Sequence, residues 1–508
     1  MSKFDEIISN DQPVNGLEFV DSQVVEAATI KRRSVVGAIA YVFRTFAIQI
    51  IAILANIALS IFLGPEEYGV YYLVVALIGL FTFLSDIGLA ATLVQKKDDP
   101  TRQDLRTTFT VQLGLAILIV LILVALTPYW QLTQGFGRAE LALLYAMAFS
   151  FVMTSLRTIP SILLERELRF DLVIIPALVE NLVFYSLVVF LAWQGWGISS
   201  YTAAVLARGI AGVIATYSIK RWPIGFALDR RSLKSLLGFG VKFQANDLLA
   251  RIKDDLFIVF LGWWLGREQL GYVGWAKRWS TYPYQLTVQS VLSVTFPTFS
   301  RIQSDQNLLK KAIEKSIYFI SLMALPMLAG IAGFIFPLLA LLPQFAKWQP
   351  AAFSLALFAL QISFSSISTP LTNTLMAIGQ INKNLWLMTF WTILTWTITP
   401  LCIWQFGFNG VAIASFAIGL TSIIPAYFVK KAVPSVTFWP HLKWQTLGAV
   451  LILLIGWLGR EFWSQSLWWL LSGMFLSVLT YAIIVIGAGW RRFKNEVQSL
   501  GVLPKWQN

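Results

Sequence analysis

Long apolar stretches alternate with short polar segments along almost the whole chain. Each stretch has roughly the 20 residues that an α-helix needs to cross about 30 Å of hydrocarbon. Fourteen such windows occur, at 41–63, 69–94, 108–128, 139–158, 172–194, 197–219, 236–264, 271–298, 316–343, 350–377, 385–406, 410–429, 445–462 and 466–489. The pattern predicts an all-α polytopic membrane protein with about 14 transmembrane helices.

Composition agrees with lipid as the surrounding solvent. Of the 508 residues, 57% are hydrophobic and only 13% are charged, and the mean hydropathy is +0.68. That leaves too little polar surface for a soluble protein of this size. Disulfides and metal centres are disfavoured, because the chain has one cysteine, Cys402, and one histidine, His441, which we expect to be a solvated side chain in a polar loop. No cofactor is expected.

The basic residues follow membrane topology. If the N-terminus is cytoplasmic, the inside loops hold 28 of the 39 lysines and arginines, the outside loops hold 4, and the predicted helices hold 7. The four outside residues are Arg138, Arg267, Lys347 and Arg460. This distribution follows the positive-inside rule and predicts that the N- and C-termini are both cytoplasmic. The formal charge of +13 therefore does not indicate a nucleic-acid partner.

An internal repeat predicts the architecture. The pattern L-G-x-E-x-x-G occurs at Leu63–Gly69 and again 202 residues later at Leu265–Gly271. Two six-helix repeats would have the same orientation and enclose a central cavity around an axis along the membrane normal. We therefore predict two parallel six-helix lobes plus two C-terminal helices. The predicted domains are 1–33 as a disordered acidic cytoplasmic tail, 34–235 as the N-lobe, 236–435 as the C-lobe, and 436–508 as helices 13 and 14 with a cytoplasmic tail.

Sequence motifs for catalysis are absent. The chain has no G-x-x-x-x-G-K-[ST], G-x-S-x-G, H-E-x-x-H or paired C-x-x-C sequence. The predicted outside loops are also too short to hold a catalytic domain. We therefore expect a transporter, and not an enzyme.

Ionisable residues inside predicted helices are the candidate functional residues. Each costs roughly 2.5 to 3.5 kcal/mol at a helix centre if it faces lipid, so these side chains must face protein or water. Seven are basic and five are acidic: Arg44, Arg208, Lys242, Arg251, Lys253, Lys277 and Arg278, with Asp86, Glu180, Asp247, Asp254 and Asp255.

The window 236–264 concentrates half of these charges. At about 100° per residue, Asp247, Arg251 and Asp255 follow one another on one face and can form ion pairs. Lys242 and Lys253 lie on another face and are predicted to be unpaired cations. The alternative is that 236–255 is a cytoplasmic surface helix, but residues 256–266 alone would then be too short to span the membrane.

Polar residues also recur along the window 271–298. Arg278, Tyr282, Gln285, Gln289 and Ser293 fall on about one helical face, which suits hydrogen bonds to sugar hydroxyls or phosphate oxygens. Contacts between helices are an equally good interpretation.

Charged residues of the first half leave a similar choice open. Glu180 and Arg208 can form a structural ion pair or a coupling-ion site. The same two interpretations hold for Arg44 and Asp86, which lie nearer the cytoplasmic side.

Five segments form an ordered set along the chain: Leu63 to Tyr71, Asp86 to Leu89, Pro160 with Leu163 to Phe170, Gly271 and Tyr272 with Ala276 and Arg278, and Phe296 and Pro297 with Ser300 and Arg301. Taken in order, they resemble the polysaccharide-exporter (Wzx-like) flippases of the multidrug, oligosaccharidyl-lipid and polysaccharide exporter superfamily. The similarity covers about residues 34–490. The resemblance implies two six-helix lobes, a cavity that opens inward and outward in turn, and transport of a polyprenyl-diphosphate-linked oligosaccharide toward the periplasm.

Residue roles follow from the charges together with that resemblance. The predicted substrate-binding residues are Lys242, Lys253, Arg278, Arg44, Arg208, Gln285 and Gln289, the first three holding the diphosphate. The predicted structural or coupling residues are Asp86, Glu180, Asp247, Arg251, Asp254 and Asp255. Coupling to protons or sodium through Asp86, Glu180 or Asp247 stays open. Membrane lipids and other polysaccharide assembly proteins are further candidate partners.

Three other functions are weighed against this one. A lipid II flippase and a multidrug exporter share the expected fold, but the excess of intramembrane cations disfavours an exporter of organic cations. A membrane glycosyltransferase or polymerase usually has a large external loop with catalytic acids. The short outside loops disfavour that class.

Overall fold

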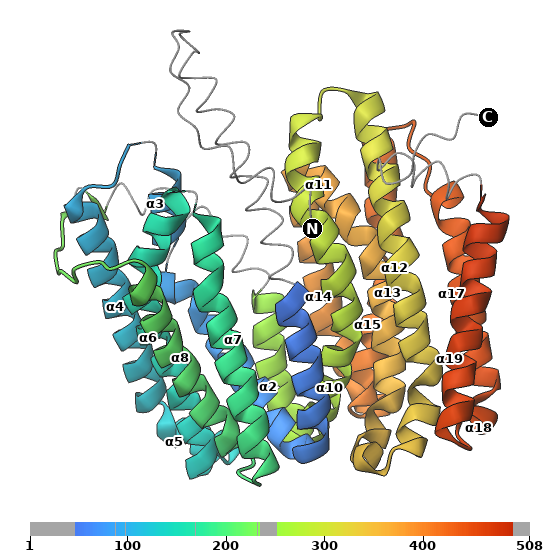
Figure 1. Cartoon of the computed structure of the whole chain (residues 1–508), viewed down its shortest axis with the longest axis horizontal. Coiled ribbons are helices and arrows are strands. Elements are labelled where there is room, and N and C mark those ends of the chain that lie inside the picture. The colour runs from blue at the N-terminus through green and yellow to red at the C-terminus, as the bar shows by residue number, and fades with distance from the viewer. Residues whose placement is uncertain are drawn as a thin grey trace, which may run out of the picture.

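The computed structural model describes residues 46–86, 88–96, 98–167, 169–230, 232–233 and 251–490. Long helices dominate these ranges, which contain no strand. The helices lie side by side in one elongated bundle (Figure 1). Three predicted site residues, Arg44, Lys242 and Asp247, lie outside the described residues, and the side chain of Asp86 is not described either. The predicted tail 1–33 also lies outside them.

The N-lobe begins with a helix over Phe46–Phe62. It continues with α2 (Pro65–Asp86), α3 (Leu89–Gln95), α4 (Arg102–Ala125), α5 (Thr127–Gln134), α6 (Arg138–Arg166), α7 (Phe170–Trp193) and α8 (Ser199–Ile219). We use the name N-lobe for these helices.

The C-lobe and the two appended helices follow. The C-lobe comprises η1 (Ile252–Leu256), α10 (Phe257–Tyr284), η2 (Gln285–Gln289), α11 (Ser290–Arg301), α12 (Gln306–Leu341), η3 (Pro343–Ala351), α13 (Ala352–Ala377), α14 (Ile381–Phe406), α15 (Asn409–Leu420) and α16 (Ile423–Ala432). The appended part comprises α17 (Trp439–Leu458), α18 (Arg460–Trp463), α19 (Leu467–Ala482) and η4 (Ile483–Ala488). The predicted boundary between the lobes stays a prediction, since 234–250 lies outside the described residues.

Ten helical segments in the described ranges are long and apolar enough to cross a membrane. Each of the ten falls on one of the predicted windows. The other four windows hold the helix Phe46–Phe62, α2 with α3, and the two arms of the run from η1 to α11. Those arms meet at Gly266, whose φ of 73° breaks α10 at the predicted outside turn. The predicted count of about 14 is therefore consistent with the structure.

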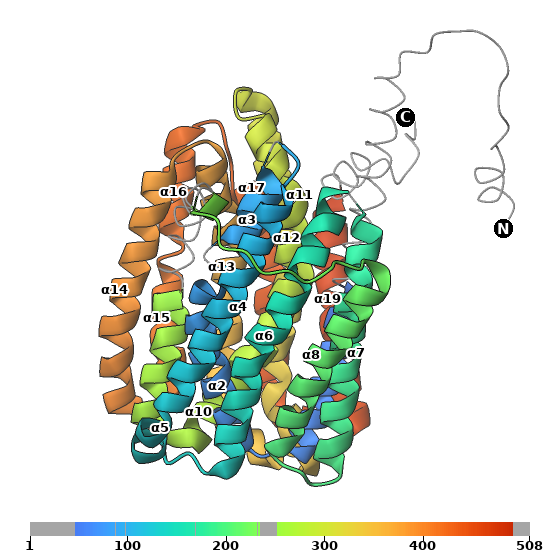
Figure 2. The same cartoon turned by 90° about the vertical axis from the view of Figure 1, so that its left-hand side faces the viewer.

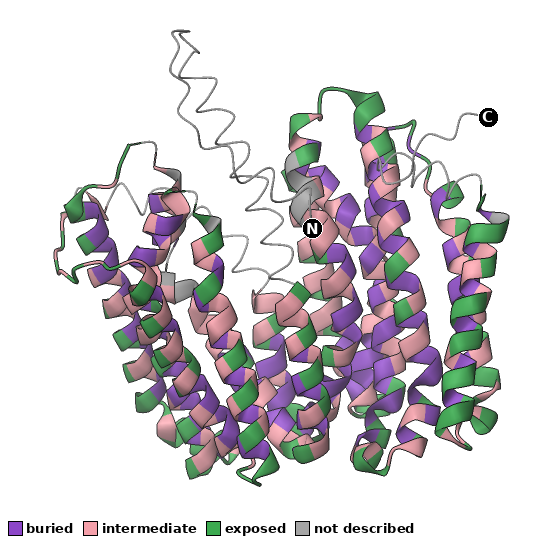
Figure 3. Ribbon diagram, viewed as in Figure 1, coloured by how far each residue is buried: buried purple, intermediate pink, exposed green. Residues whose placement is uncertain are grey.

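Burial follows the expected membrane pattern. Buried residues line the contacts between helices, and exposed residues cover the outward faces (Figure 3). Large apolar side chains are among the most exposed, including Leu132 at 87%, Trp468 at 82% and Trp404 at 79%. Apolar surface of this extent is typical of a lipid-facing protein.

Two corrections concern predicted loops. The fourth window, 139–158, is expected to end before Pro160, but α6 continues through this proline to Arg166. Neighbouring helices make an interior proline tolerable in a membrane. Arg157 is one of the 28 basic residues assigned to the inside loops, but it lies within α6 and contacts Glu180 of α7. His441 is also not solvated: α17 begins at Trp439, and His441 is buried with its Nε2 3.4 Å from Glu314 Oε2.

The two lobes share one hydrophobic core at one end of the bundle. The largest cluster joins Leu73 and Val74 of α2 to Trp275 and Ala276 of α10. At the other end, the clusters around Phe109 and Phe299 each belong to a single lobe. The described helices of the two lobes are therefore packed together most firmly at the end that holds the shared cluster.

The predicted repeat appears as a reciprocal contact. A Cβ atom at Gly69 would overlap the carbonyl oxygen of Arg267, and a Cβ atom at Gly271 would overlap that of Pro65. Both pairs are related by the same offset of 202 residues, so α2 and α10 cross about a local two-fold axis. The prediction that the two L-G-x-E-x-x-G turns lie at the same end of the molecule is confirmed.

Loops predicted to lie on opposite sides of the membrane lie at opposite ends of the bundle. Helices α3 and α11 lie at one end, and α5 and α18 at the other (Figure 1). Seen at right angles, α16 lies at the same end as α3 (Figure 2). The end with α3, α11 and α16 is the predicted cytoplasmic end, and we call the other the outer end. Which end faces the cytoplasm stays a prediction.

Candidate functional site

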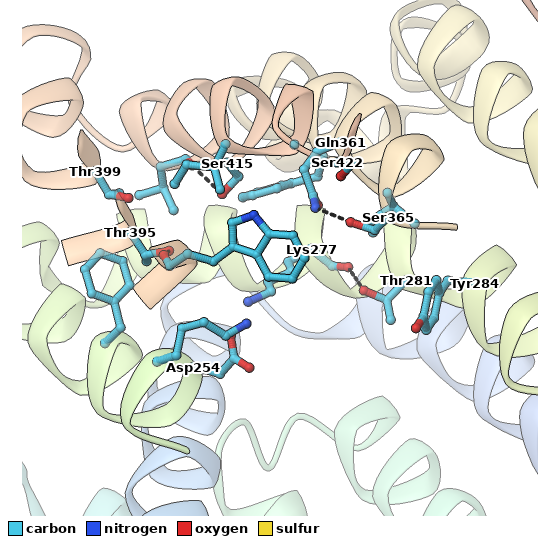
Figure 4. Close-up of a pocket in the computed structure, with 18 of the residues that line it drawn as sticks. Asp254, Lys277, Thr281, Tyr284, Gln361, Ser365, Thr395, Thr399, Ser415 and Ser422 are labelled. Carbon is cyan, nitrogen blue, oxygen red and sulfur yellow. Dashed lines mark hydrogen bonds and ion pairs between the residues drawn. The ribbon is translucent and has the colours of Figure 1, made fainter. Parts of the chain in front are cut away.

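A cavity of about 520 Å³ lies within the C-lobe and reaches its seam with the N-lobe. Its walls come from η1, α10, α13, α14 and α15, and Tyr72 of α2 closes the seam side. Lys277 and Asp254 lie on one side, opposite the hydroxyl groups of Thr395, Ser415 and Ser422 (Figure 4). This volume is typical of small-molecule sites.

Two lysines, Lys253 and Lys277, and one aspartate, Asp254, give the cavity lining its charge. Lys253 Nζ lies 3.3 Å from Asp254 Oδ1, and both residues line the cavity. Lys277 interacts electrostatically with Tyr72, Asp254 and Asp255. The prediction that Lys253 is unpaired is therefore wrong.

The reason lies in the backbone. Residues Ile252–Leu256 form a π-helix, whose turn is wider than that of an α-helix. An α-helical projection therefore misplaces Lys253 relative to Asp254, because adjacent residues of an α-helix do not face each other. The predicted pair between Arg251 and Asp255 is present, at 3.4 Å. Arg251 Nη1 also donates to the Gly79 carbonyl at 2.6 Å, which joins η1 to α2.

Hydroxyl and amide groups form the opposite wall. Thr395 and Ser415 each donate to a carbonyl one turn earlier in their own helix, both at 2.8 Å. Thr369 donates to the Ser365 carbonyl in the same way, at 2.8 Å. A hydroxyl has one proton and two lone pairs, so Thr395 and Ser415 can still accept hydrogen bonds. Thr369 already accepts from Tyr284 Oη at 3.2 Å and has one lone pair left. Gln361 Nε2 donates to Ser365 Oγ at 2.7 Å, which leaves the second amide proton and the amide oxygen for a ligand.

Trp391 supplies an aromatic surface to the same cavity. Its Nε1 donates to Thr421 Oγ1 at 2.9 Å, so the indole is held from α14 toward the end of α15. The polar group of the indole is satisfied, and the ring packs against the apolar cluster of Leu387 and Val429 while it also contributes to the cavity lining. Phe358 and Tyr284 add further aromatic lining.

The predicted polar stripe does not line this cavity. Arg278 lies one residue beyond Lys277 and is exposed on the side facing the N-lobe. Its Nε donates to Tyr282 Oη at 3.2 Å and its Nη2 to Tyr185 Oη of α7 at 3.4 Å. Gln285 and Gln289 belong to the π-helix η2, which changes the helical phase, and neither lines the cavity. Lys253 and Arg278 therefore lie on different surfaces.

In the N-lobe, Glu180 is buried between two arginines. Its Oε2 lies 3.6 Å from Arg208 Nε, and its Oε1 accepts from Arg157 Nη1. The ion pair between Glu180 and Arg208, one of the two interpretations left open, is present. Arg157 is a third member that the loop assignment missed. Arg208 is still half exposed and lies 5.7 Å from the Phe184 ring centroid.

The outer end is sealed by contacts between the lobes. Trp348 of η3 meets Tyr68 of α2 edge to face, with centroids 5.0 Å apart, and stacks on Trp275 of its own lobe at 4.9 Å. Trp348 Nε1 donates to the Ser60 carbonyl at 2.8 Å, and Trp275 Nε1 donates to Ser60 Oγ at 2.9 Å. Lys347 Nζ donates to the Ile61 carbonyl at 2.7 Å.

Sequence reasoning missed much of the cavity. Lys277 was identified as an intramembrane cation but was not assigned to the site. The hydroxyl wall of α13 left a signal, because eight of the twelve residues over 363–374 are Ser, Thr or Asn. So polar a run inside a membrane window indicates a polar partner or cavity. In the described part of the chain, no cluster of three His, Cys, Asp or Glu residues could hold a metal ion.

Known proteins resemble this chain over about half of its length or more. It is 23% identical over 49% of its length to a teichuronic acid biosynthesis protein of Bacillus subtilis (strain 168), covering 51% of that protein. It is 23% identical over 63% of its length to a succinoglycan biosynthesis transport protein of Rhizobium meliloti (strain 1021), covering 64% of it. The chain thus spans between half and two thirds of these relatives.

A solved structure has the same fold. A lipid II flippase in its inward closed conformation superposes with a TM-score of 0.68 at 15% identity, over 90% of this chain and 99% of the other. Transporters of the multidrug, oligosaccharidyl-lipid and polysaccharide exporter superfamily share this fold. Residues 58–353 match the model of a family described as polysaccharide biosynthesis protein. The match covers more than half of this multi-pass membrane protein, and the chain therefore belongs to the polysaccharide biosynthesis protein family.

Proposed function

We propose that this protein moves a polyprenyl-diphosphate-linked oligosaccharide from the inner to the outer leaflet of the bacterial cytoplasmic membrane. The supporting observation is the pairing of a polar, lysine-containing cavity at the lobe seam with a seal of direct contacts at the outer end. Transport would proceed by alternating access, in which this seal opens while the opposite end closes.

The energetics of the cargo explain why such a cavity is needed. A sugar hydroxyl that loses water without gaining a partner costs on the order of 1 to 3 kcal/mol, so an oligosaccharide does not cross hydrocarbon unaided. The cavity wall replaces water with hydroxyl, amide and ammonium groups. An inside-negative potential adds about 2.3 kcal/mol per charge per 100 mV in favour of outward movement of an anion.

The diphosphate would interact with the cations that face the lobe seam. Arg278 is exposed toward α7, and Arg208 is half exposed beside Glu180. Guanidinium groups form forked hydrogen bonds with phosphate oxygens, which makes these two arginines the preferred anchors among the described residues. Lys242 and Arg44 remain candidates from the sequence alone.

Other cargoes fit the described surfaces less well. An organic cation would have to bind beside Lys277 and Lys253, two ammonium groups that repel it. A lipid II substrate has the same diphosphate and sugar chemistry, so membership of the polysaccharide family favours a polysaccharide precursor over it. Proton or sodium coupling remains part of the proposal, with Glu180 as its best-described acidic candidate.

Reconstitution in liposomes tests the proposal. A fluorescent polyprenyl-diphosphate oligosaccharide is placed in both leaflets, and an added glycosidase reports the fraction that is accessible from outside. We expect wild-type protein to make almost all of the probe accessible, while protein-free liposomes leave about half protected.

Two variants make the test specific. Arg278→Gln should slow exposure of the probe, whereas Arg460→Gln, which removes a cation from the outer surface, should not. If wild-type protein leaves the protected fraction equal to that in protein-free liposomes, the proposed function is wrong.

A further inference from the structure

We propose that the C-lobe cavity is a saccharide-binding subsite, in which Trp391 stacks on a sugar ring and Gln361 and Lys277 bind its polar groups. The inference rests on the proposed function and adds to it. It separates recognition of the glycan from recognition of the diphosphate, which the seam-facing arginines would bind. The two surfaces lie on different sides of α10, at the adjacent residues Lys277 and Arg278.

The shape of the cavity favours an elongated polar ligand. Its lining on α14 extends from Asn384 to Thr399, a distance of about 22 Å along the helix axis. The volume of about 520 Å³ is sufficient for a short saccharide. Tyr72 of the N-lobe belongs to the wall, so a ligand there would lie against both lobes.

The hydrogen-bonding groups match sugar hydroxyls in kind. Thr369, Thr395 and Ser415 have donated their protons to backbone carbonyls, so they present acceptors for sugar O–H groups. Gln361 and Lys277 supply donors for sugar oxygens. A saccharide hydroxyl both donates and accepts, and this wall offers partners for both directions.

Trp391 supplies an apolar aromatic surface, which hydroxyl groups alone do not provide. The ring faces of an indole are apolar and carry partial negative charge, which suits the C–H face of a pyranose. Its N–H is already bonded to Thr421, so the ring is held in place before a ligand arrives. Such preorganisation reduces the entropic cost of binding.

The charges of the cavity argue against a metal or organic cation as its ligand. Lys253 and Lys277 already lie beside the two carboxylates of Asp254 and Asp255. A further cation would meet two ammonium groups in a partly dehydrated space. A neutral or acidic sugar meets no such repulsion.

Trp391→Ala tests the subsite, and Trp404→Ala is its matched control. Both residues lie on α14, but Trp404 is 79% exposed and does not line the cavity. We expect Trp391→Ala to slow flipping of the oligosaccharide probe about tenfold, as the loss of one aromatic contact of about 1.4 kcal/mol predicts. Flipping of a sugar-free polyprenyl-diphosphate probe should be unchanged, and Trp404→Ala should change neither rate.

A binding measurement separates this inference from the proposed function. Saturation-transfer NMR with the free oligosaccharide and protein in nanodiscs should give sugar signals for wild type and Trp404→Ala, and a strongly reduced signal for Trp391→Ala. Gln361→Leu, which preserves side-chain volume, should weaken the same signal if Trp391→Ala proves unstable. Sugar binding without flipping would overturn only the proposed function. Equal signals from all variants, or equal slowing of both probes by Trp391→Ala, would overturn the subsite.

Discussion

Arg267 is the side chain that most directly ties the outer turn of the C-lobe to the N-lobe. Its Nη1 lies 3.1 Å from Glu140 Oε1 and 3.5 Å from Glu66 Oε1. Its Nη2 donates to the carbonyl groups of Gln134, at 2.9 Å, and Gly135. All four partners belong to the N-lobe, so opening of the outer end must break these contacts. We predict that Arg267→Gln shifts the protein toward the outward-open state.

The magnitude follows from the exposure of each partner. The pair with Glu140 is mostly buried, with side chains 23% and 18% exposed, and a charge-assisted bond of this kind contributes about 1.5 to 3 kcal/mol. Glu66 is 65% exposed, so its pair adds less than about 1 kcal/mol. Glutamine can retain one of the carbonyl contacts. The net loss is therefore about 2 to 3 kcal/mol, or roughly 30- to 150-fold in the ratio of closed to open states.

Distances between spin labels measure this shift. Labels at Leu132→Cys in α5 and Gln349→Cys in η3, in a Cys402→Ser background, report the separation of the lobes at the outer end. Both positions are exposed. Wild type should give mainly the short distance, and Arg267→Gln should give a large population of a longer one. Arg138→Gln is the matched control, because it removes an exposed arginine at the same end.

Two results would refute the reasoning. An unchanged distance distribution in Arg267→Gln would show that the aromatic contacts of Trp348 hold the outer end closed without the arginine. An equal shift in Arg138→Gln would show that loss of charge, and not loss of contacts between the lobes, is responsible.

Three further predictions follow from the described contacts. Gly271→Ala adds a methyl group that would overlap the Pro65 carbonyl oxygen of the other lobe, so it should lower the free energy of unfolding by more than about 3 kcal/mol. Thermal unfolding in detergent measures this loss, and a melting temperature equal to that of wild type would contradict the close approach. Glu180→Gln leaves Arg157 and Arg208 without a carboxylate partner and should lower the free energy of unfolding by about 3 kcal/mol. Size-exclusion chromatography should then show less folded protein than for wild type, and equal amounts would show that the carboxylate is not needed for folding. A phosphatase reporter fused after Lys220 should be inactive, and periplasmic activity would contradict the fourteen-helix topology.

Most of the fold could be predicted from hydrophobic windows and one repeat. Helices that span lipid must be long and apolar, so their sequence signal is strong, and the ten segments found by length and composition all fall on predicted windows. The repeat at Leu63–Gly69 and Leu265–Gly271 was readable because close backbone crossing requires glycine at both positions. Both signals come from requirements that few residue types satisfy.

The site was less predictable, because its geometry departs from the regular α-helix. Two π-helical segments, Ile252–Leu256 and Gln285–Gln289, interrupt the helices that contain the predicted charges. Each changes the helical phase, so a projection at 100° per residue separated Lys253 from Asp254 and placed Gln285 with Arg278. No residue type in these segments marks the π turn in advance.

Tertiary contacts account for the rest of the differences. His441 is buried because α17 begins earlier than its apolar window and its Nε2 lies beside Glu314 of α12. Arg157 lies in the bundle because α6 continues through Pro160 and reaches Glu180 of α7. Each side chain is compensated by a partner far away in the sequence, which a single helix cannot reveal.

The local two-fold axis allows the residues that surround the cavity to be compared with their equivalents in the other lobe. Tyr72 and Gly274 are related by the 202-residue offset and also contact each other, so they lie at the axis. The same offset relates Lys277 to Val75, so the fold itself does not require a cation there. Because Gly274 has no side chain, the ring of Tyr72 occupies the space above it and interacts with Lys277. The repeat thus builds a symmetric crossing, and substitutions on the α10 side alone convert its surroundings into a charged cavity.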